Sequence, residues 1–266
     1  MLGTEFAIDK QFFLDLGGYD PGMEIWGGEE MELSFKTWMC GGSMWVIPCS
    51  SVAHLFRLAK HRSFPFHLTN ILRVAHVWMD DYKHEVFERY GDVCNDRDVG
   101  NITDRLKIKE KLQCKNFQWY MKNIAYMADV PKDVIAQGEI HNQGKPEQCL
   151  CAAVGGWSDP ENLKVKTRQC QRRGYEEFWM ITKSGLLRRD SRCVLYSATT
   201  KKLTHVECND TNQHMKWNFT MNNTLVHELS GKCLSLRNDL TMEECSQGEE
   251  LQQWKLVRRP KAPPIR

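Results

Sequence analysis

The stretch EIWGGEEMELSF, residues 24–35, places a tryptophan and two glycines directly before three glutamates. Met31 and Phe35 lie at helical spacing, so we expect a helix that begins near Glu29, where the helix dipole favours negative charge. Adjacent glycines leave backbone N–H groups uncovered and let a ligand approach closely. A helix cap accounts for one acidic residue, whereas three exceed what capping needs. The stretch is therefore a candidate ligand site as well as a helix start.

A second group of polar residues lies in SVAHLFR, where His54 and Arg57 are three positions apart. A histidine nitrogen can ligate a transition metal, and a guanidinium offers a fixed fork of donors that suits phosphate. The same residue types also fit a structural histidine and a solvated surface arginine. The residues by themselves leave both interpretations open.

Strand-like and helical patterns alternate over residues 1–128, and these elements must position the polar groups. The short apolar runs EFAI and SMWVIPC are typical of strands. Apolar residues recur at helical spacing from about Leu68 to Tyr90, and a second helical pattern runs from about Asp104 to Ile124. The second pattern places these residues roughly on one side: Leu106, Leu112, Phe117 and Tyr120. We expect an α/β domain.

Charge and cysteine content restrict the class of protein. With 36 basic and 34 acidic residues, the chain lacks the concentrated positive charge that nucleic-acid binding requires. Of eleven cysteines, seven lie between Cys149 and Cys245. Four N-x-[ST] sequons accompany them, at Asn101, Asn209, Asn218 and Asn222. Dense cysteines together with candidate glycosylation sites indicate an oxidising lumen.

The N-terminal sequence MLGTEFAIDKQFF has neither the apolar core of a signal peptide nor a run that could cross a membrane. We therefore expect this chain to be the C-terminal part of a longer secretory protein, with any membrane anchor in the longer form.

Residues 129–148 lose all periodicity and are rich in polar residues, glycine and proline, which predicts a linker between two domains. Residues 258–266 predict a disordered tail. Between them, residues 149–257 repeat one pattern three times: a cysteine precedes a tryptophan by nine positions at Cys170, Cys208 and Cys245. Each unit opens with another cysteine, namely Cys149 or Cys151, then Cys193, then Cys233. The pattern predicts three units that each close a disulfide loop and bury Trp179, Trp217 or Trp254.

This three-unit domain resembles a ricin-type β-trefoil lectin, an all-β fold marked by Cys-Leu-Asp and Gln-x-Trp in each repeat. The tryptophan elements are EFW, MKW and QQW, and only the third keeps the glutamine, Gln252. None of the repeats has the sugar-binding aspartate, since the opening segments are CLC, CVL and CLS. The resemblance then implies either weak binding of GalNAc glycans or a structural or partner-binding role.

The first half, from about Gly3 to Pro131, resembles the C-terminal part of the GT-A-like catalytic domain of polypeptide N-acetylgalactosaminyltransferases. The resemblance rests on the long segment GGYDPGMEIWGGEEMELSFKTWMCGGSMWVIPCSSVAHLFR. It implies retaining, Mn²⁺-assisted transfer of GalNAc from UDP-GalNAc to Ser or Thr of a polypeptide or glycopeptide. Location in the Golgi lumen or membrane is likewise implied.

The resemblance also implies roles for individual residues. Glu29 would accept hydrogen bonds from the donor sugar, beside an apolar wall formed by Trp26. His54 would be one Mn²⁺ ligand, and Arg57 would contact the diphosphate. Further contacts would come from Gly3 to the donor and from Phe56 near the acceptor. The family's asparagine after this glutamate is replaced by Glu30, and the segment LAKHRSFPFHLTN departs from the family's mobile loop.

By the same resemblance, Cys40 would pair with Cys114. The three repeats would close as Cys151 (or Cys149) with Cys170, Cys193 with Cys208, and Cys233 with Cys245. The family's Asp-x-His metal motif does not occur in these 266 residues, so we expect this chain by itself to be inactive. The alternative is a catalytically inactive secretory pseudoenzyme, or a carbohydrate- or protein-binding trefoil module.

Overall fold

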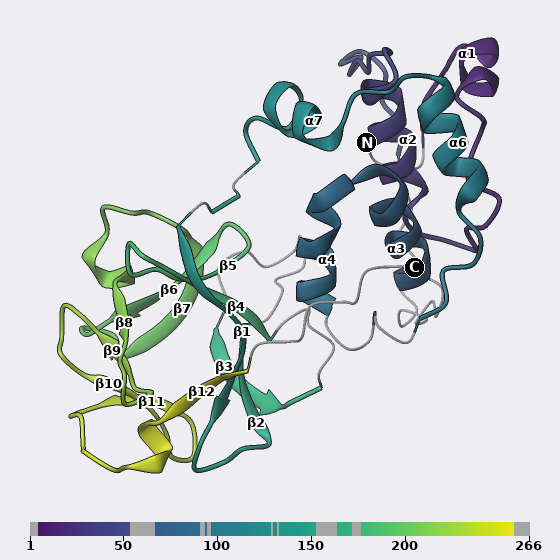
Figure 1. Cartoon of the computed structure of the whole chain (residues 1–266). Coiled ribbons are helices and arrows are strands. Elements are labelled where there is room, and N and C mark those ends of the chain that lie inside the picture. Colours follow the sequence, from purple (N-terminus) through teal and green to yellow (C-terminus); the bar gives the residue numbers. More distant parts are fainter. Residues whose placement is uncertain are drawn as a thin grey trace. The chain divides into compact units, whose positions relative to one another are not determined.

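A computed structural model describes residues 5–53, 67–90, 94, 97–128, 130–131, 133–152, 164–171 and 177–257. The chain divides into two compact units, a helical one over residues 1–87 and 94–128 and a β-rich one over residues 88–93 and 129–266 (Figure 1). The predicted tail, residues 258–266, lies outside the described residues. Within the described parts, every helix is too short or too polar to span a bilayer.

The helical unit has a small apolar core between three of its helices. Its elements are α1 (Lys10–Asp15), α2 (Glu29–Met39), α3 (His67–Trp78), η1 (Asp80–Tyr82), α4 (Lys83–Tyr90), α6 (Thr103–Lys111) and α7 (Phe117–Asn123). Met39 of α2, Val74, Val77 and Trp78 of α3, and Phe117 of α7 are buried against one another. The Cys40–Cys114 disulfide joins the end of α2 to the segment before α7, as the family resemblance implies.

Both long helices that the periodicity predicts are interrupted in the structure. The first ends at Trp78, because Asp80 has a positive φ of 47° and its carboxylate accepts hydrogen bonds from Lys109 and from the Phe117 N–H at 2.6 and 2.7 Å. The second ends at Lys111, and its predicted inward residue Leu106 is exposed. Tertiary contacts and a disulfide, which periodicity does not encode, break these helices.

The two predicted strands of this unit do not form among its described residues. EFAI and SMWVIPC have no strand pairing, and Trp45 is 83% exposed. A strand is stabilised by hydrogen bonds to a neighbouring strand. Within the described residues 5–53, 67–90 and 97–128, no strand is present to supply them. Apolar residues favour a strand, but pairing with another strand decides whether one exists.

The second unit is a trefoil of three four-stranded repeats. The first comprises β1 (Val134–Asn142), β2 (Gln148–Ala152), β3 (Val165–Gln169) and β4 (Phe178–Thr182). The second comprises β5 (Leu187–Arg189), β6 (Arg192–Ser197), β7 (Lys202–Glu207) and β8 (Trp217–Phe219), with η2 (Gln213–Met215). The third comprises β9 (Leu225–His227), β10 (Cys233–Leu236), β11 (Leu240–Glu243) and β12 (Trp254–Val257), with η3 (Glu250–Gln252).

One hydrogen-bonded sheet runs β3-β2-β1-β4-β5-β6-β7, with β12 also on β1, and another runs β11-β10-β9-β8. The strand pairs of the described residues are antiparallel, for example β1 with β4 and β12.

The three repeat tryptophans occupy equivalent places at the centre of this unit. Trp179, Trp217 and Trp254 are buried in one apolar cluster. Each indole N–H donates to the carbonyl of the residue after an opening cysteine, at 2.8–2.9 Å: Leu150, Val194 and Leu234, respectively. Because a buried indole N–H needs an acceptor, this bond fixes each ring in place. The prediction that these tryptophans form the core is confirmed.

This equivalence decides the first disulfide, for which the sequence left both Cys149 and Cys151 open. The structure pairs Cys149, not Cys151, with Cys170, while Cys193–Cys208 and Cys233–Cys245 are as expected. Since Leu150 accepts the Trp179 bond, Cys149 is the true counterpart of the other opening cysteines. Cys151 lies opposite Lys166 in the β2–β3 ladder. Because Lys166 precedes Cys170 by four residues, Cys151 is too far along the strand to reach Cys170.

The predicted linker over residues 129–148 is also wrong. Val134–Asn142 form β1, which pairs with β2, β4 and β12. The sequence hides this strand because its buried residues include the polar Glu139 and Asn142. Asn142 is satisfied by donating to the Leu251 carbonyl at 3.0 Å, a partner far away in the sequence. The strand β1 is partly buried, yet its sequence lacks the alternation of apolar and polar residues that would have predicted it.

Two buried histidines make the trefoil sensitive to acid. Burial, aided by the nearby Arg189, lowers the pKa of His205 to about 4, and burial also lowers the pKa of His227. Below pH 6.5 the unfolded chain binds a proton at His205, whereas the folded chain leaves this residue neutral until about pH 4. The free energy of unfolding therefore has its full value above pH 6.5 and falls by about 3 kcal/mol towards pH 4. We expect the melting temperature in calorimetry to fall over this window.

His205→Gln should flatten the decline, and the part that remains is expected from His227. An identical pH profile in the native chain and in His205→Gln would contradict the assignment.

Candidate functional site

The loop before α2 has an unusual backbone. Ile25, Gly27 and Gly28 have positive φ values of 57°, 97° and 93°. This region is rare for a β-branched residue such as isoleucine, and such strain clusters at functional sites. The loop nevertheless exposes apolar side chains, with Ile25 74% and Trp26 51% exposed. The backbone is held so that an indole faces solvent just before the helix.

Residues of α3 hold this loop. The buried amide of Asn70 accepts from the Glu24 N–H at 3.0 Å and donates to the Glu24 and Trp26 carbonyls at 2.9 and 3.2 Å. The Trp26 ring stacks on His67 with centroids 5.2 Å apart. A Cβ at Gly27 would lie 2.2 Å from a His67 ring carbon, which explains the glycine. Neither Asn70 nor His67 was predicted from the sequence, although a polar residue such as Asn70 within an apolar helix pattern is a usable signal.

The three glutamates of α2 have different surroundings. Glu32 is buried, accepts the Asp20 N–H at 3.1 Å and pairs with Lys36 at 3.1 Å, so it is structural. Burial raises the pKa of Glu32, and the charge of Lys36 opposes that shift. Glu29 and Glu30 are only partly buried at the helix start, where no side chain caps the helix. Among the described residues, one Glu30 carboxylate oxygen is buried without a hydrogen-bond partner.

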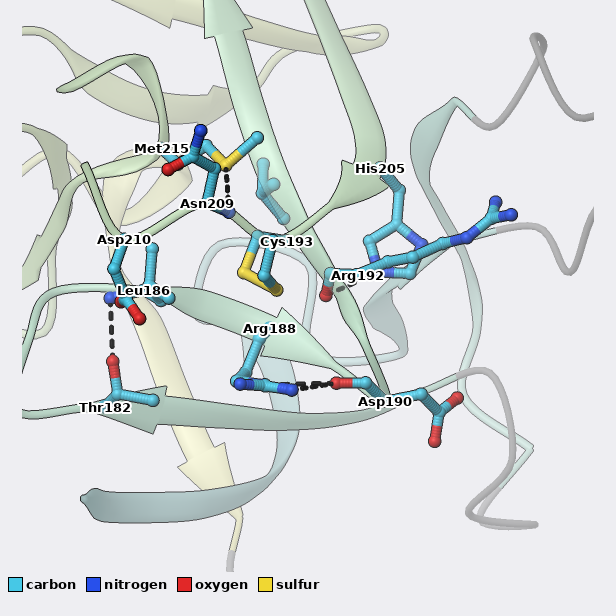
Figure 2. The surroundings of a disulfide bond; sticks show 12 residues. Thr182, Leu186, Arg188, Asp190, Arg192, Cys193, His205, Asn209, Asp210 and Met215 are labelled. Carbon is cyan, nitrogen blue, oxygen red and sulfur yellow. Dashed lines mark hydrogen bonds between the residues drawn. A yellow bond between two sulfur atoms is a disulfide. The ribbon is translucent and has the colours of Figure 1, made fainter. Parts of the chain in front are cut away.

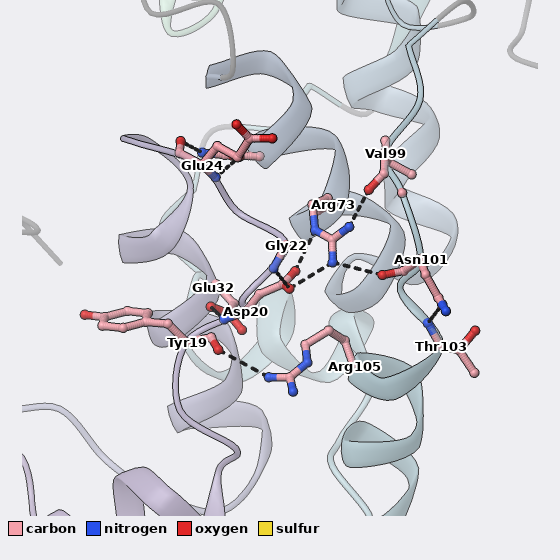
Figure 3. Close-up of polar contacts among 12 residues, drawn as sticks. Tyr19, Asp20, Gly22, Glu24, Glu32, Arg73, Val99, Asn101, Thr103 and Arg105 are labelled. Carbon is pink, nitrogen blue, oxygen red and sulfur yellow. Dashed lines mark hydrogen bonds and ion pairs between the residues drawn. The ribbon is translucent and has the colours of Figure 1, made fainter.

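A buried ion pair anchors the segment that leads into this loop (Figure 3). Arg73 of α3 donates two hydrogen bonds of 2.8 Å to the Asp20 carboxylate, and it also contacts the carbonyls of Val99 and Asn101. Burial tends to raise the pKa of Asp20, but hydrogen bonds from Arg73 and the Gly22 N–H outweigh it and lower the pKa. Asp20 therefore stays ionised, and the loop starts from a fixed point.

This arrangement suits a sugar. A pyranose presents an apolar face, which packs on an exposed indole, and hydroxyl groups, which donate to carboxylates. Trp26 on the loop and Glu29 at the first position of α2 supply both kinds of group. The other site residues that the sequence analysis proposed, Gly3, His54, Phe56 and Arg57, lie outside the described residues.

Groups of side chains with metal-ligand spacing lie elsewhere. Among the described residues, the two clusters with metal-ligand spacing are His141, Cys149 and Cys170, and Glu139, Cys149 and Glu177. Both belong to the trefoil. The described residues of the helical unit thus do not by themselves form a manganese site.

The three repeats carry Cys151, Leu195 and Ser235 where ricin-type lectins have the sugar-binding aspartate, and Cys151 and Ser235 are buried. The sequon asparagines Asn101, Asn209, Asn218 and Asn222 are all exposed.

A helical unit with an acidic, tryptophan-bearing loop, followed by a trefoil, is the arrangement expected of the C-terminal part of a lectin-bearing glycosyltransferase. Residues 136–254 match the ricin-type beta-trefoil lectin domain. The chain is 38% identical over 263 residues to polypeptide N-acetylgalactosaminyltransferase 5 of Caenorhabditis elegans, covering 96% of this chain and 41% of that protein. It is 42% identical over 266 residues to putative polypeptide N-acetylgalactosaminyltransferase 9 of Drosophila melanogaster, covering 96% and 40%.

The crystal structure of GalNAc-T7 with UDP, GalNAc and Mn²⁺ superposes with a TM-score of 0.72 at 29% identity, covering 98% of this chain and 49% of that one. Over the stretch that it spans, the chain belongs to the polypeptide N-acetylgalactosaminyltransferase family. The predicted fold class, the C-terminal part of a glycosyltransferase domain followed by a trefoil, is confirmed. The chain spans less than half the length of these relatives.

Proposed function

We propose that the chain supplies the donor-sugar edge and the lectin-like domain of a UDP-GalNAc:polypeptide N-acetylgalactosaminyltransferase of the Golgi lumen. The acceptor would be Ser or Thr of a polypeptide or glycopeptide. The observation that carries the proposal is the strained loop of Trp26, which continues into Glu29 and is fixed by Asn70. Sequence identity over 96% of the chain supports the choice of donor.

In this proposal, Glu29 accepts hydrogen bonds from hydroxyls of the GalNAc ring, and Trp26 excludes water from its apolar face. Fixing the sugar in one orientation directs its anomeric carbon towards the acceptor hydroxyl, which lowers the entropy cost of transfer with retention. Mn²⁺, when bound, would neutralise charge on the departing UDP. His54 would be its ligand from this chain, and Arg57 would contact the diphosphate.

The test is a chimera in which this chain replaces the matching stretch of the C. elegans relative. The chimera should transfer GalNAc from UDP-GalNAc to a Thr-containing peptide with Mn²⁺. Glu29→Gln should reduce kcat/KM by about 10²-fold, because a charge-assisted hydrogen bond contributes about 1.5–3 kcal/mol. Glu110→Gln, at an exposed position of α6, is the matched control and should be neutral.

The 266-residue chain alone should show no transfer, because its sequence has no Asp-x-His and offers only His54 in the metal role. One ligand does not hold a catalytic metal. Turnover by this chain alone would contradict that view.

A second candidate is a non-catalytic secretory module whose trefoil contacts glycans or proteins. The buried residues in place of the lectin aspartates favour a partner-binding or structural trefoil over a GalNAc-specific one. A chimera that folds but never transfers GalNAc would support this candidate. Clear GalNAc specificity of the chain on a glycan array would instead establish a working lectin site.

A further inference from the structure

The first trefoil repeat differs from the other two around its disulfide. In each repeat, the opening cysteine lies opposite a residue of the neighbouring strand. In the first repeat, His141 lies opposite Cys149. The corresponding pairs are Arg188 with Cys193 and Val226 with Cys233. Only the first repeat therefore places a metal-ligating side chain there. Figure 2 shows the second repeat, where Arg188 lies near Cys193 and donates instead to the Asp190 carbonyl at 2.6–3.0 Å.

A second difference lies two residues before each tryptophan. Glu177, Met215 and Gln252 share one structural task, which is to accept the backbone N–H of the residue after the closing cysteine. Gln252 does so at 2.8 Å and Met215 at 3.4 Å, so the task does not require a carboxylate. The Glu177 carboxylate also accepts a hydrogen bond from Arg168 at 2.8 Å, so both it and His141 have structural partners in addition to their place beside the disulfide.

Both of these residues of the first repeat, His141 and Glu177, lie near the Cys149–Cys170 disulfide. His141 Nδ1 lies 3.5 Å from Cys170 Sγ, and the ligand atoms of His141, Cys149 and Cys170 all lie within 4.8 Å of one another. Glu177 belongs to an overlapping group through Cys149, together with Glu139. Glu139 also lies 3.1 Å from Nε2 of His141, the position of the carboxylate that orients a metal-bound imidazole.

We propose that the first repeat becomes a Zn²⁺ site when its disulfide is reduced. The ligands would be the Cys149 and Cys170 thiolates, His141 Nδ1 and a Glu177 oxygen, with Glu139 orienting the imidazole. Two sulfurs and an imidazole favour zinc over magnesium or calcium. Zn²⁺ would replace the contact of His141 Nδ1 with the Pro146 carbonyl at 3.2 Å.

Formation of the site requires a thiol reductant. Two reductant thiols reduce the disulfide to two cysteine thiols and become a disulfide themselves. Binding of Zn²⁺ then displaces one proton from each cysteine thiol. Reoxidation removes both thiolates and releases the ion. His141 and Cys170 are partly exposed, which leaves a path for the metal.

The test uses the full chain, titrated with a dithiol reductant with and without Zn²⁺, followed by alkylation and mass spectrometry. We expect Zn²⁺ to protect Cys149 and Cys170 from alkylation at one ion per chain. Co²⁺ in place of Zn²⁺ should give sulfur-to-metal charge-transfer absorption. The built-in controls are Cys193–Cys208 and Cys233–Cys245, whose cysteines should gain no protection because Arg188 and Val226 cannot ligate zinc.

His141→Asn should weaken zinc binding at least tenfold, and it also removes a partner of the buried Glu139 from the oxidised chain. Glu177→Gln, which installs the residue of the third repeat, is a second variant in case the first fails to fold, and it should also weaken binding. Equal protection of all three cysteine pairs, protection of none, or unchanged zinc affinity in both variants would overturn the proposal. None of these readouts depends on transferase activity.

Discussion

Replacing Arg73 by methionine should lower the free energy of unfolding of the helical unit by about 3–5 kcal/mol, the usual effect of removing one partner of a buried ion pair. Asp20 would keep a buried carboxylate without its two 2.8 Å hydrogen bonds from arginine. The segment that leads to the Trp26 loop would lose its anchor. Hydrogen exchange measures the effect, because amides of α2 and α3 should exchange faster while those of the trefoil strands should not.

Arg105→Met provides the matched control. Arg105 carries the same charge and donates to the Gly17 carbonyl at 2.9 Å, but it is partly exposed and leaves no carboxylate behind. Its replacement should cost about 1 kcal/mol or less. The double variant Asp20→Leu/Arg73→Met should recover part of the loss, because no lone buried charge remains. Equal destabilisation by Arg73→Met and Arg105→Met would refute the importance of the pair.

Cys149→Ala should destabilise the trefoil by about 3 kcal/mol, because it opens a disulfide between residues 21 positions apart and restores entropy to the unfolded chain. Cys151→Ala, two residues away in the same strand and equally buried, should cost only about 1 kcal/mol. Urea unfolding under non-reducing conditions, followed by tryptophan fluorescence, compares the two variants directly.

Counting thiols in the denatured variants gives an independent check. The native chain has three cysteines outside disulfides, so Cys149→Ala should show one thiol more and Cys151→Ala one fewer. The reverse result would mean that Cys151 closes the first repeat.

Several features could be predicted from residue spacing because they repeat or are locally encoded. The nine-residue separation of cysteine and tryptophan recurs three times, and a repeated unit must bury the same residue each time. The core placement of Trp179, Trp217 and Trp254 followed from that regularity. The start of α2 at Glu29 was equally local, since glycines followed by acids specify a helix N-terminus.

Other features depended on partners distant in sequence. The strand β1 was hidden because its buried Glu139 and Asn142 are polar, and only pairing with β4 and β12 makes their burial tolerable. The helix from Leu68 ends early because Asp80 is bound by Lys109 and Phe117, which are 29 and 37 residues away. Periodicity reports how a segment fits one buried face, and it contains no information on which other segment supplies that face.

The sequence by itself determined the family, the order of the two units, the threefold cysteine–tryptophan array and the acidic start of α2. The tertiary structure decided which cysteine closes the first repeat, which of three glutamates is structural, and that Asn70 and Arg73 hold the Trp26 loop. The physical reason is the same in each case. Hydrogen bonds and disulfides depend on distances between atoms in three dimensions, and chain positions as far apart as Asp20 and Arg73 meet only after the helices have packed.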